Sequence, residues 1–129
     1  MLPDYSTAMG YDTEAIGNYS TAMGIYTETN SYANLVIGRY NVGGGTGTSW
    51  TYSDPLFEVG NGSSASYRSN AFTILKNGNV GIGTHTPTKG KLEILGSQQC
   101  CGTTNGTFSY YLYSNGVHAN GYGWNHFGP

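Results

Sequence analysis

The chain is short of the large aliphatic side chains from which most single domains build a core. Leu, Ile, Val and Phe together make up 22 of its 129 residues, below the share of roughly 20% under which a chain struggles to bury a core of its own. Charge is scarce as well, since charged residues are 9% of the chain and the formal net charge is −2. Such a chain is expected either to stay disordered or to find burial in partner chains and backbone ladders.

The shortage of positive charge excludes one class of partner. Five Lys and Arg residues scattered along the chain cannot form the basic stripe that binding to nucleic-acid phosphates requires. Long apolar runs are missing too, because no stretch approaches the roughly 20 residues that span a bilayer, and no signal peptide is evident at the start. We therefore expect no nucleic-acid partner and no membrane insertion in this segment.

Cysteine is limited to the neighbours Cys100 and Cys101. Adjacent Cα atoms lie about 3.8 Å apart, below the usual span of a disulfide, so a bond between these two would be strained. We interpret them as buried small thiols, with bonds between chains around a symmetry axis as the alternative. Neither interpretation fixes the redox compartment of the protein.

Glycine and aromatic residues are abundant instead. The chain holds 21 Gly, 12 Tyr and 2 Trp, which is too many aromatic side chains for a disordered linker. Aromatic and Thr-rich stretches favour the half-buried surface of a pleated sheet. The composition therefore predicts an all-β fold.

A 14-residue repeat organises the first third of the chain. Residues 5–10 (Tyr-Ser-Thr-Ala-Met-Gly) recur at residues 19–24, and a looser copy follows at residues 33–38. A unit this short can bury an apolar face only by stacking on the next unit, which predicts a parallel β-solenoid over residues 1–43. A helix is the alternative, but β-branched Thr, Tyr and a Gly in each unit oppose it. The face expected to be buried comprises Ala8, Met9, Ala22, Met23, Val36 and Ile37.

Turn signals divide the middle of the chain into short strands. Residues 44–53 are rich in Gly and are expected to form a loop where the repeat ends. Asn61-Gly62 and Asn77-Gly78 favour hairpin turns, because both residues accept positive φ. The expected strands of the next segment, residues 54–96, are 56–59, 71–75, 80–82 and 92–95.

The last segment, residues 97–129, has no Asp, Glu, Lys or Arg but seven aromatic residues. Its alternation predicts a β tip or shaft with small side chains on one face and large ones on the other. Flat rings with polar edges suit sugar faces or a protein surface, although the same rings could interlock inside an oligomer tip. The candidate ligand-binding residues are Tyr111, Tyr113, His118, Tyr122, Trp124 and His126.

The two histidines of this segment, His118 and His126, share one face of the expected strand. Threefold symmetry would bring copies of each near an axis, where a metal could bind. About 27 Å of strand separates them, however, so they cannot share one ion within a chain. We interpret both as packing or hydrogen-bonding residues and predict no metal and no cofactor.

The Tyr-Ser-Thr-Ala-Met-Gly units resemble the head repeats of trimeric autotransporter adhesins, the YadA-like head. In that family each unit forms one coil of a left-handed parallel β-roll, and three chains associate side by side. Residues 57–71 resemble the neck that follows such heads, while residues 76–84 and 87–95 resemble a segment of phage-type tail fibres and large bacterial surface proteins. The resemblance covers roughly residues 4–96.

The resemblance implies a homotrimer in which the β-roll is followed by neck-like hairpins. Candidate trimer contacts are Met9, Met23 and Ile37 in the repeats and, by analogy with the neck, Arg68 and Asn70. It also implies an extracellular location, on a bacterial cell surface or a phage tail fibre, and a cell-surface glycan or protein as receptor.

Catalysis is not expected. The carboxylates are dispersed through the repeats and turns rather than converging with an acid, base or nucleophile, and motifs of known hydrolase and metal sites are missing. The sequence therefore predicts a non-catalytic fibre or adhesin segment that mediates attachment to a cell or host surface. The alternative is a purely structural filament or shaft that acts as a spacer for a binding domain elsewhere.

Overall fold

The computed structural model describes residues 3–95, in which every regular element is a β-strand. The all-β prediction is confirmed for this part of the chain, whereas the expected tip or shaft at residues 97–129 lies outside it. None of these residues belongs to a helix with the length and apolar character needed to cross a membrane. In chain order the strands are β1 Thr7–Tyr11, β2 Glu14–Ala15, β3 Thr21–Ile25, β4 Glu28–Thr29, β5 Leu35–Arg39, β6 Pro55–Asn61, β7 Asn70–Leu75, β8 Val80–Ile82 and β9 Leu92–Ile94.

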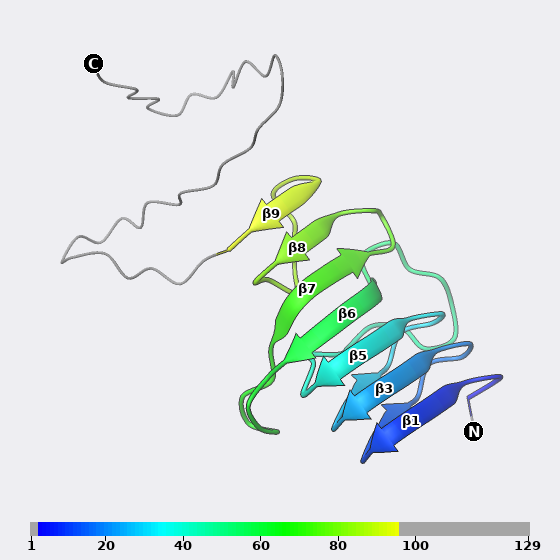
Figure 1. Ribbon diagram of the computed structural model, residues 1–129. Coiled ribbons are helices and arrows are strands. Elements are labelled where there is room, and N and C mark those ends of the chain that lie inside the picture. The colour runs from blue at the N-terminus through cyan, green and yellow to red at the C-terminus, as the bar shows by residue number, and fades with distance from the viewer. Residues whose placement is uncertain (1–2, 96–129) are drawn as a thin grey trace, which may run out of the picture. The chain divides into compact units, whose positions relative to one another are not determined.

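One seven-stranded sheet runs through the described residues. Its strand order is β1-β3-β5-β6-β7-β8-β9, and Figure 1 shows these strands side by side. The first four pair in parallel, β6, β7 and β8 pair antiparallel, and β9 pairs in parallel with β8. The short strands β2 and β4 form a second, parallel sheet.

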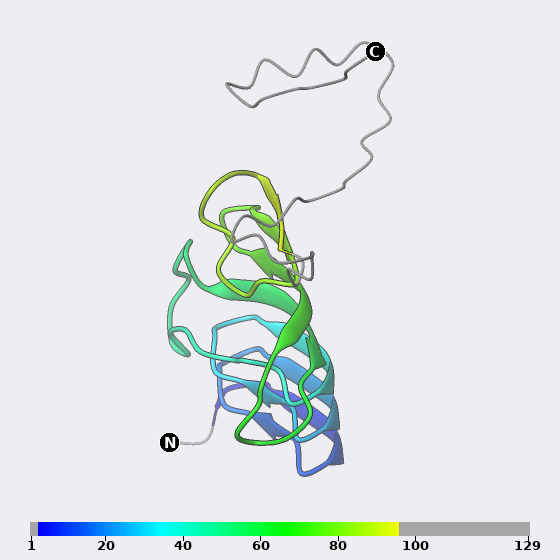
Figure 2. The same ribbon diagram turned by 90° about the vertical axis from the view of Figure 1, so that its left-hand side faces the viewer.

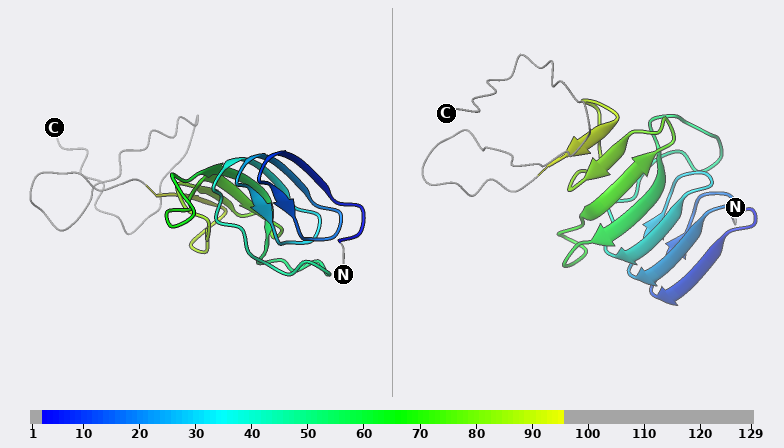
Figure 3. Two further views of the ribbon diagram at one scale, coloured as in Figure 1. Left: turned by 90° about the horizontal axis from the view of Figure 1, so that it is seen from below. Right: turned by 45° about the horizontal axis from the view of Figure 1, so that its top comes forward.

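Successive repeats stack as coils. Thr7 pairs with Thr21, and Thr21 pairs with Leu35, so each residue lies opposite its equivalent 14 positions later. Within each of the first two repeats the chain passes from the long sheet to the short sheet and back, which Figures 2 and 3 show as a narrow coil. The parallel β-solenoid expected from the repeat is therefore observed.

The parallel stack continues one strand past the expected end of the repeat. Strand β6 pairs with β5, and Phe57 lies opposite Leu35. These two residues are 22 positions apart rather than 14, because the Gly-rich stretch at 44–53 is inserted between the strands as a loop. Residues 57–60 (Phe-Glu-Val-Gly) thus occupy a fourth rung above residues 35–38 (Leu-Val-Ile-Gly).

The two Asn-Gly pairs have different roles. Asn77-Gly78 makes the tight turn between β7 and β8, in which Gly78 has φ 86° and its N–H donates to the Leu75 carbonyl over 2.8 Å. Asn61-Gly62 does not close a two-residue hairpin, because the chain continues through residues 62–69, with a bridge between Ser64 and Tyr67, before β7 returns along β6.

A column of glycines sets the distance between coils. Gly10, Gly24, Gly38 and Gly60 lie opposite one another on adjacent strands, and the first three have φ between 97° and 138°. A Cβ atom at Gly24 would overlap the backbone carbonyl of Gly38. The repeated glycine is therefore required by close backbone approach as well as by its φ angle.

Other residues with positive φ mark the corners of each coil. They recur with the period of the repeat and have φ between 41° and 59°, a left-handed conformation that costs a non-glycine residue roughly 1 kcal/mol. Most are tyrosines, whose rings stack on those of neighbouring coils. The corner residues are Tyr5, Asp12, Tyr19, Tyr26, Ala33 and Tyr40.

The interior of the coil is narrow and largely polar. Among the described residues the buried hydrophobic side chains are Ala22, Val36 and Leu75, and the buried polar ones include Ser20 and Thr29, whose hydroxyls are 2.7 Å apart. The expectation that the Ala and Met positions form one buried face is wrong for the methionines. Adjacent residues of a strand point to opposite sides, so stacking buries Ala22 and Val36 but leaves the methionine positions on the outside.

Candidate functional site

The surface with the clearest capacity for function is the outer side of the seven-stranded sheet. Residues paired across strands share one side of the sheet, and two rows of side chains cross all seven strands on the side opposite Ala22 and Val36. We call these two rows the outer face. The first row is Met9, Met23, Ile37, Val59, Phe72, Ile82 and Ile94, and the second is Thr7, Thr21, Leu35, Phe57, Ile74, Val80 and Leu92.

The outer face is apolar and accessible. Met9 is 58% exposed, Leu92 49% and Met23 36%, and no strand or loop within residues 3–95 packs over the face as a further layer (Figure 3). Seven strands at about 4.8 Å spacing extend the rows over roughly 29 Å. An apolar area of this extent is about the size of the largest patch on a typical soluble single chain, a few hundred Å², and such a patch is often functional.

Three of the candidate trimer contacts are the first three members of one row, at its β1 end. Met9, Met23 and Ile37 occupy equivalent positions on β1, β3 and β5 and are direct cross-strand neighbours. Their period of 14 residues places them in a straight line along the coil, where a second chain with the same period could match them. Their role between chains stays a prediction.

The first of two tyrosine ladders runs along one corner of the coil. The Tyr5 and Tyr19 rings stack with centroids 5.6 Å apart, and Tyr32 continues the ladder edge-on at 5.3 Å. The ammonium of Lys76 ends it, 5.9 Å from the Tyr32 centroid and 5.1 Å from that of Trp50. These distances are within the range of cation–π attraction.

Lys76 is nearly buried, with 7% of its surface exposed. Its Nζ donates a hydrogen bond to the Ser31 hydroxyl over 2.7 Å, which ties β7 to the third coil. Burial lowers the pKa of the Lys76 ammonium, and the nearby Asp54 carboxylate partly offsets this effect. No local pattern in the sequence singles out this lysine, because its burial depends on the loop that carries Trp50.

The second tyrosine ladder consists of Tyr11, Tyr26 and Tyr40. Tyr26 meets Tyr11 edge-on at 5.4 Å and stacks on Tyr40 at 4.8 Å. The pKa of Tyr26 is raised, first by a side-chain hydrogen bond with Tyr11 and then by the charges that would form on neighbouring groups. Arg68 ends this ladder 5.9 Å from the Tyr40 centroid.

Arg68, a candidate trimer contact, is used within its own chain. Its Nη1 donates to the carbonyls of Tyr26 and Asn41 over 3.3 and 3.1 Å, and its Nη2 lies 3.9 Å from the Glu28 carboxylate. The side chain retains 28% exposure. Arg68 thus anchors the connection between β6 and β7 to the coils below, and a contact with another chain stays a prediction.

Asn70, the other candidate from the neck-like stretch, is buried in a network around Glu58. The Glu58 carboxylate is 1% exposed and occupies the interior position of the fourth rung, above Val36. Asn70 Nδ2 and Gly43 N donate to its Oε1 over 2.7 and 3.1 Å. Asn34 and Asn41 donate to Oε2 over 2.9 and 3.4 Å. This network joins the top of the solenoid to Gly43, which precedes the inserted loop, and to β7.

The candidate ligand-binding residues of the last segment, Tyr111, Tyr113, His118, Tyr122, Trp124 and His126, lie outside the described residues. Within residues 3–95 no group of three or more His, Cys, Asp or Glu side chains has an arrangement that could hold a metal ion. The surface features that the structure does place are therefore the outer face and the two ladders.

No protein-family model, no curated protein and no solved structure matches the chain.

Proposed function

We propose that the chain is a segment of an extracellular homotrimeric fibre that attaches to a cell or host surface and catalyses no reaction. The observation that carries the proposal is the outer face, an apolar surface across seven strands that no described residue covers. In this proposal the coils form a left-handed β-roll of the YadA-like kind, and the stretch containing β6, β7 and β8 serves as the neck.

Identical chains are the occupants that fit the outer face best. Its apolar positions recur every 14 residues along the coil, and a parallel copy offers the same spacing. Three copies around a common axis would each turn this face inward and leave the polar edge at Glu14 and Glu28 in water. Met9, Met23 and Ile37 are the contacts along the repeats, while Arg68 and Asn70 hold the neck in the shape that the neighbouring chains meet.

The mass in solution tests the trimer. We expect a species of three times 13.7 kDa in sedimentation equilibrium at micromolar concentration. The double variant Met23→Glu, Ile37→Glu places two charges on neighbouring strands of the outer face, β3 and β5, and is expected to dissociate the trimer. Thr48→Glu, at an exposed position in the inserted loop, is the matched control and should leave the mass unchanged. A folded wild-type monomer would refute the proposal.

Attachment and spacing are separate functions of such a fibre. The aromatic, uncharged composition of residues 97–129 favours attachment, because flat amphipathic rings give a large contact area at low entropic cost. Removal of these residues should abolish binding to target cells while the trimer persists. If the shortened protein binds as well as the full chain, the segment is a shaft that spaces a binding domain elsewhere.

A further inference from the structure

A pocket of about 320 Å³ opens beside the turn between β7 and β8. Leu75 lies in its lining, and Leu75 alternates with Ile74 of the outer face along β7. The pocket is therefore on the side of the sheet opposite the outer face, so association through that face leaves it open.

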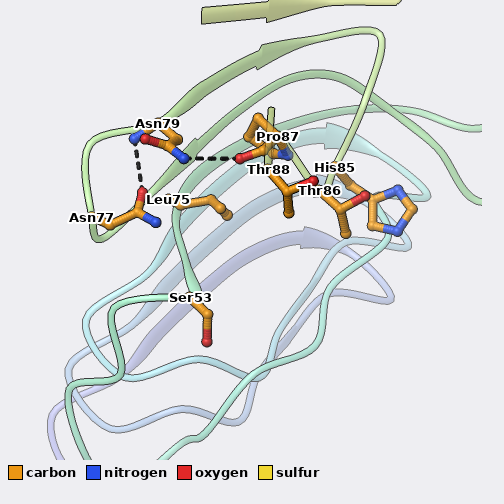
Figure 4. Close-up of a pocket in the computed structure, with 8 residues that line it drawn as sticks. All are labelled: Ser53, Leu75, Asn77, Asn79, His85, Thr86, Pro87 and Thr88. Carbon is orange, nitrogen blue, oxygen red and sulfur yellow. Dashed lines mark hydrogen bonds between the residues drawn. The ribbon is translucent and has the colours of Figure 1, made fainter. Parts of the chain in front are cut away.

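The base of the pocket is apolar and held in place. Leu75 is 5% exposed, and Pro87 is among the fully buried side chains. The Pro87 carbonyl accepts a hydrogen bond from Asn79 Nδ2 over 3.0 Å, which fixes the loop between β8 and β9 against the turn (Figure 4). The base can thus receive an apolar surface of a ligand without rearrangement.

The rim of the pocket is polar and neutral. Ser53, Thr86 and Thr88 contribute hydroxyls, each of which can donate and accept a hydrogen bond. Asn77 accepts from the Asn79 N–H over 2.8 Å through its Oδ1, which orients its carboxamide, and its Nδ2 donates to no group within residues 3–95. An imidazole from His85 completes the rim, and no carboxylate, Lys or Arg belongs to the lining.

The backbone of an exposed aromatic residue lies next to the rim. Tyr52 is 69% exposed and precedes Ser53, and the Asn77 N–H donates to the Tyr52 carbonyl over 2.9 Å. This bond holds the inserted loop at the pocket.

We infer that this pocket binds one or two neutral sugar units of a surface glycan. A neutral sugar combines an apolar face of C–H groups with a surrounding ring of hydroxyls, which matches an apolar base with a rim of hydroxyls and amides. The lining itself supplies no charged side chain to a charged ligand. Two charged groups bond to lining residues, since Lys91 Nζ donates to the Asn77 carbonyl over 2.8 Å and the Glu93 carboxylate accepts from the Thr88 N–H over 3.1 Å, and these bonds occupy them. A wholly apolar ligand would leave the rim unpaired. The volume is at the low end of the roughly 300–1,000 Å³ typical of small-ligand sites. The biological role of the pocket rests on the proposed attachment function.

The test uses the full chain, labelled for NMR, titrated with methyl glycosides of glucose, galactose and N-acetylglucosamine, and separately with glucuronate. We expect saturable shifts of the Asn77 side-chain amide and of residues 85–88 with at least one neutral glycoside. The double variant Thr86→Val, Thr88→Val, which keeps side-chain shape, should bind about tenfold more weakly, since each lost hydrogen bond weakens binding by a few-fold. The exposed His85→Ala provides a second variant, and Thr13→Val, on the first coil, is the control.

In the titration, the inference is overturned if no neutral glycoside gives a saturable shift, if the shifts are confined to residues 97–129, or if glucuronate alone binds. In the comparison of variants, it is overturned if both pocket variants bind the glycoside as tightly as the wild-type protein. The mass of each sample is measured in parallel. A trimer without sugar binding refutes the pocket inference alone, whereas a monomer that binds sugar refutes the fibre proposal alone.

Discussion

Replacement of Glu58 by glutamine tests whether the top of the solenoid depends on a buried carboxylate. Glutamine has the same shape as glutamate but offers one oxygen where glutamate offers two. Whichever oxygen is lost, two of the four donors that surround the carboxylate then face an NH2 group. The variant therefore removes hydrogen bonds without opening a cavity.

The bond lengths indicate which pair is lost. The donors to Oε1, Asn70 and Gly43, lie at 2.7 and 3.1 Å, and those to Oε2, Asn34 and Asn41, lie at 2.9 and 3.4 Å. The introduced amide is expected to keep its oxygen on the shorter pair, so that one good bond and one long bond are lost. Hydrogen bonds to charged groups contribute about 1.5–3 kcal/mol each, so the free energy of unfolding should fall by about 2–4 kcal/mol.

Glu58→Gln also removes a buried charge, and this second effect raises the free energy of unfolding. Within residues 3–95 the ion pair is between Arg68 and Glu28, and Glu58 takes no part in it. The charge of Glu58 is therefore compensated by the neutral donors around it. If its desolvation outweighed those four bonds, glutamine would stabilise the fold. Urea unfolding at fixed protein concentration decides between the two effects. Glu14→Gln, at an exposed position of β2, is the control and should change stability by less than about 0.5 kcal/mol. Equal or higher stability of Glu58→Gln would refute our account of the network.

Three further predictions concern the coil and its ladders. In urea unfolding, Gly24→Ala should destabilise the fold by several kcal/mol more than Gly44→Ala. Both glycines have positive φ, but only at Gly24 would a Cβ atom meet the backbone of a neighbouring strand. Equal effects would show that close backbone packing is not the reason for glycine at position 24. Burial lowers the pKa of Lys76 below 10.5, so the unfolded chain binds its proton more tightly and stability should rise as the pH rises from the folded pKa to 10.5. Lys76→Met should flatten that rise, and an unchanged pH profile of stability would contradict it. Tyr26 has a pKa raised above 10.0, so its contribution to stability is complete below pH 10 and is lost as the pH rises through the folded pKa. Tyr11→Phe should lower the pKa of Tyr26 in an absorbance titration of tyrosinate. An unchanged titration would show that Tyr11 does not raise the pKa of Tyr26.

Local signals are sufficient to predict much of the fold. The repeat predicts the parallel stack because identical spacing of Gly10, Gly24 and Gly38 leaves one register in which backbones can approach. The turn at Asn77-Gly78 is predictable because glycine accepts the positive φ that Gly78 adopts, although Asn77 does not adopt the positive φ that the Asn-Gly signal also allows. The strand expected at 71–75 is observed as Asn70–Leu75, since a short apolar run between turn signals has few other conformations.

Other features depend on contacts far apart in sequence. A glutamate at position 58 is expected to be solvated, and only the donors from the third coil (Asn34 and Asn41), from Gly43 and from Asn70 of β7 make its burial tolerable. The sequence does hold a signal, since Phe-Glu-Val-Gly at 57–60 matches Leu-Val-Ile-Gly at 35–38 and so places Glu58 in the interior. The separation of the Ala and Met positions could have been derived from strand alternation alone. Lys76 offers no local signal.

The two sides of the long sheet together explain the shortage of aliphatic residues. The interior holds small and polar side chains, so its hydrogen-bond ladders order the chain but supply little hydrophobic free energy. An outer face of roughly 29 by 10 Å has an area of about 300 Å², whose burial at about 25 cal/mol/Å² contributes about 7 kcal/mol per chain. That is comparable with the entire stability of a typical domain, about 5–15 kcal/mol. Association through this face, as in the proposed trimer, would therefore contribute as much as folding itself, and we predict that the midpoint of thermal unfolding rises with protein concentration. A midpoint independent of concentration over a hundredfold dilution would show that the coil is stable with its apolar side in water.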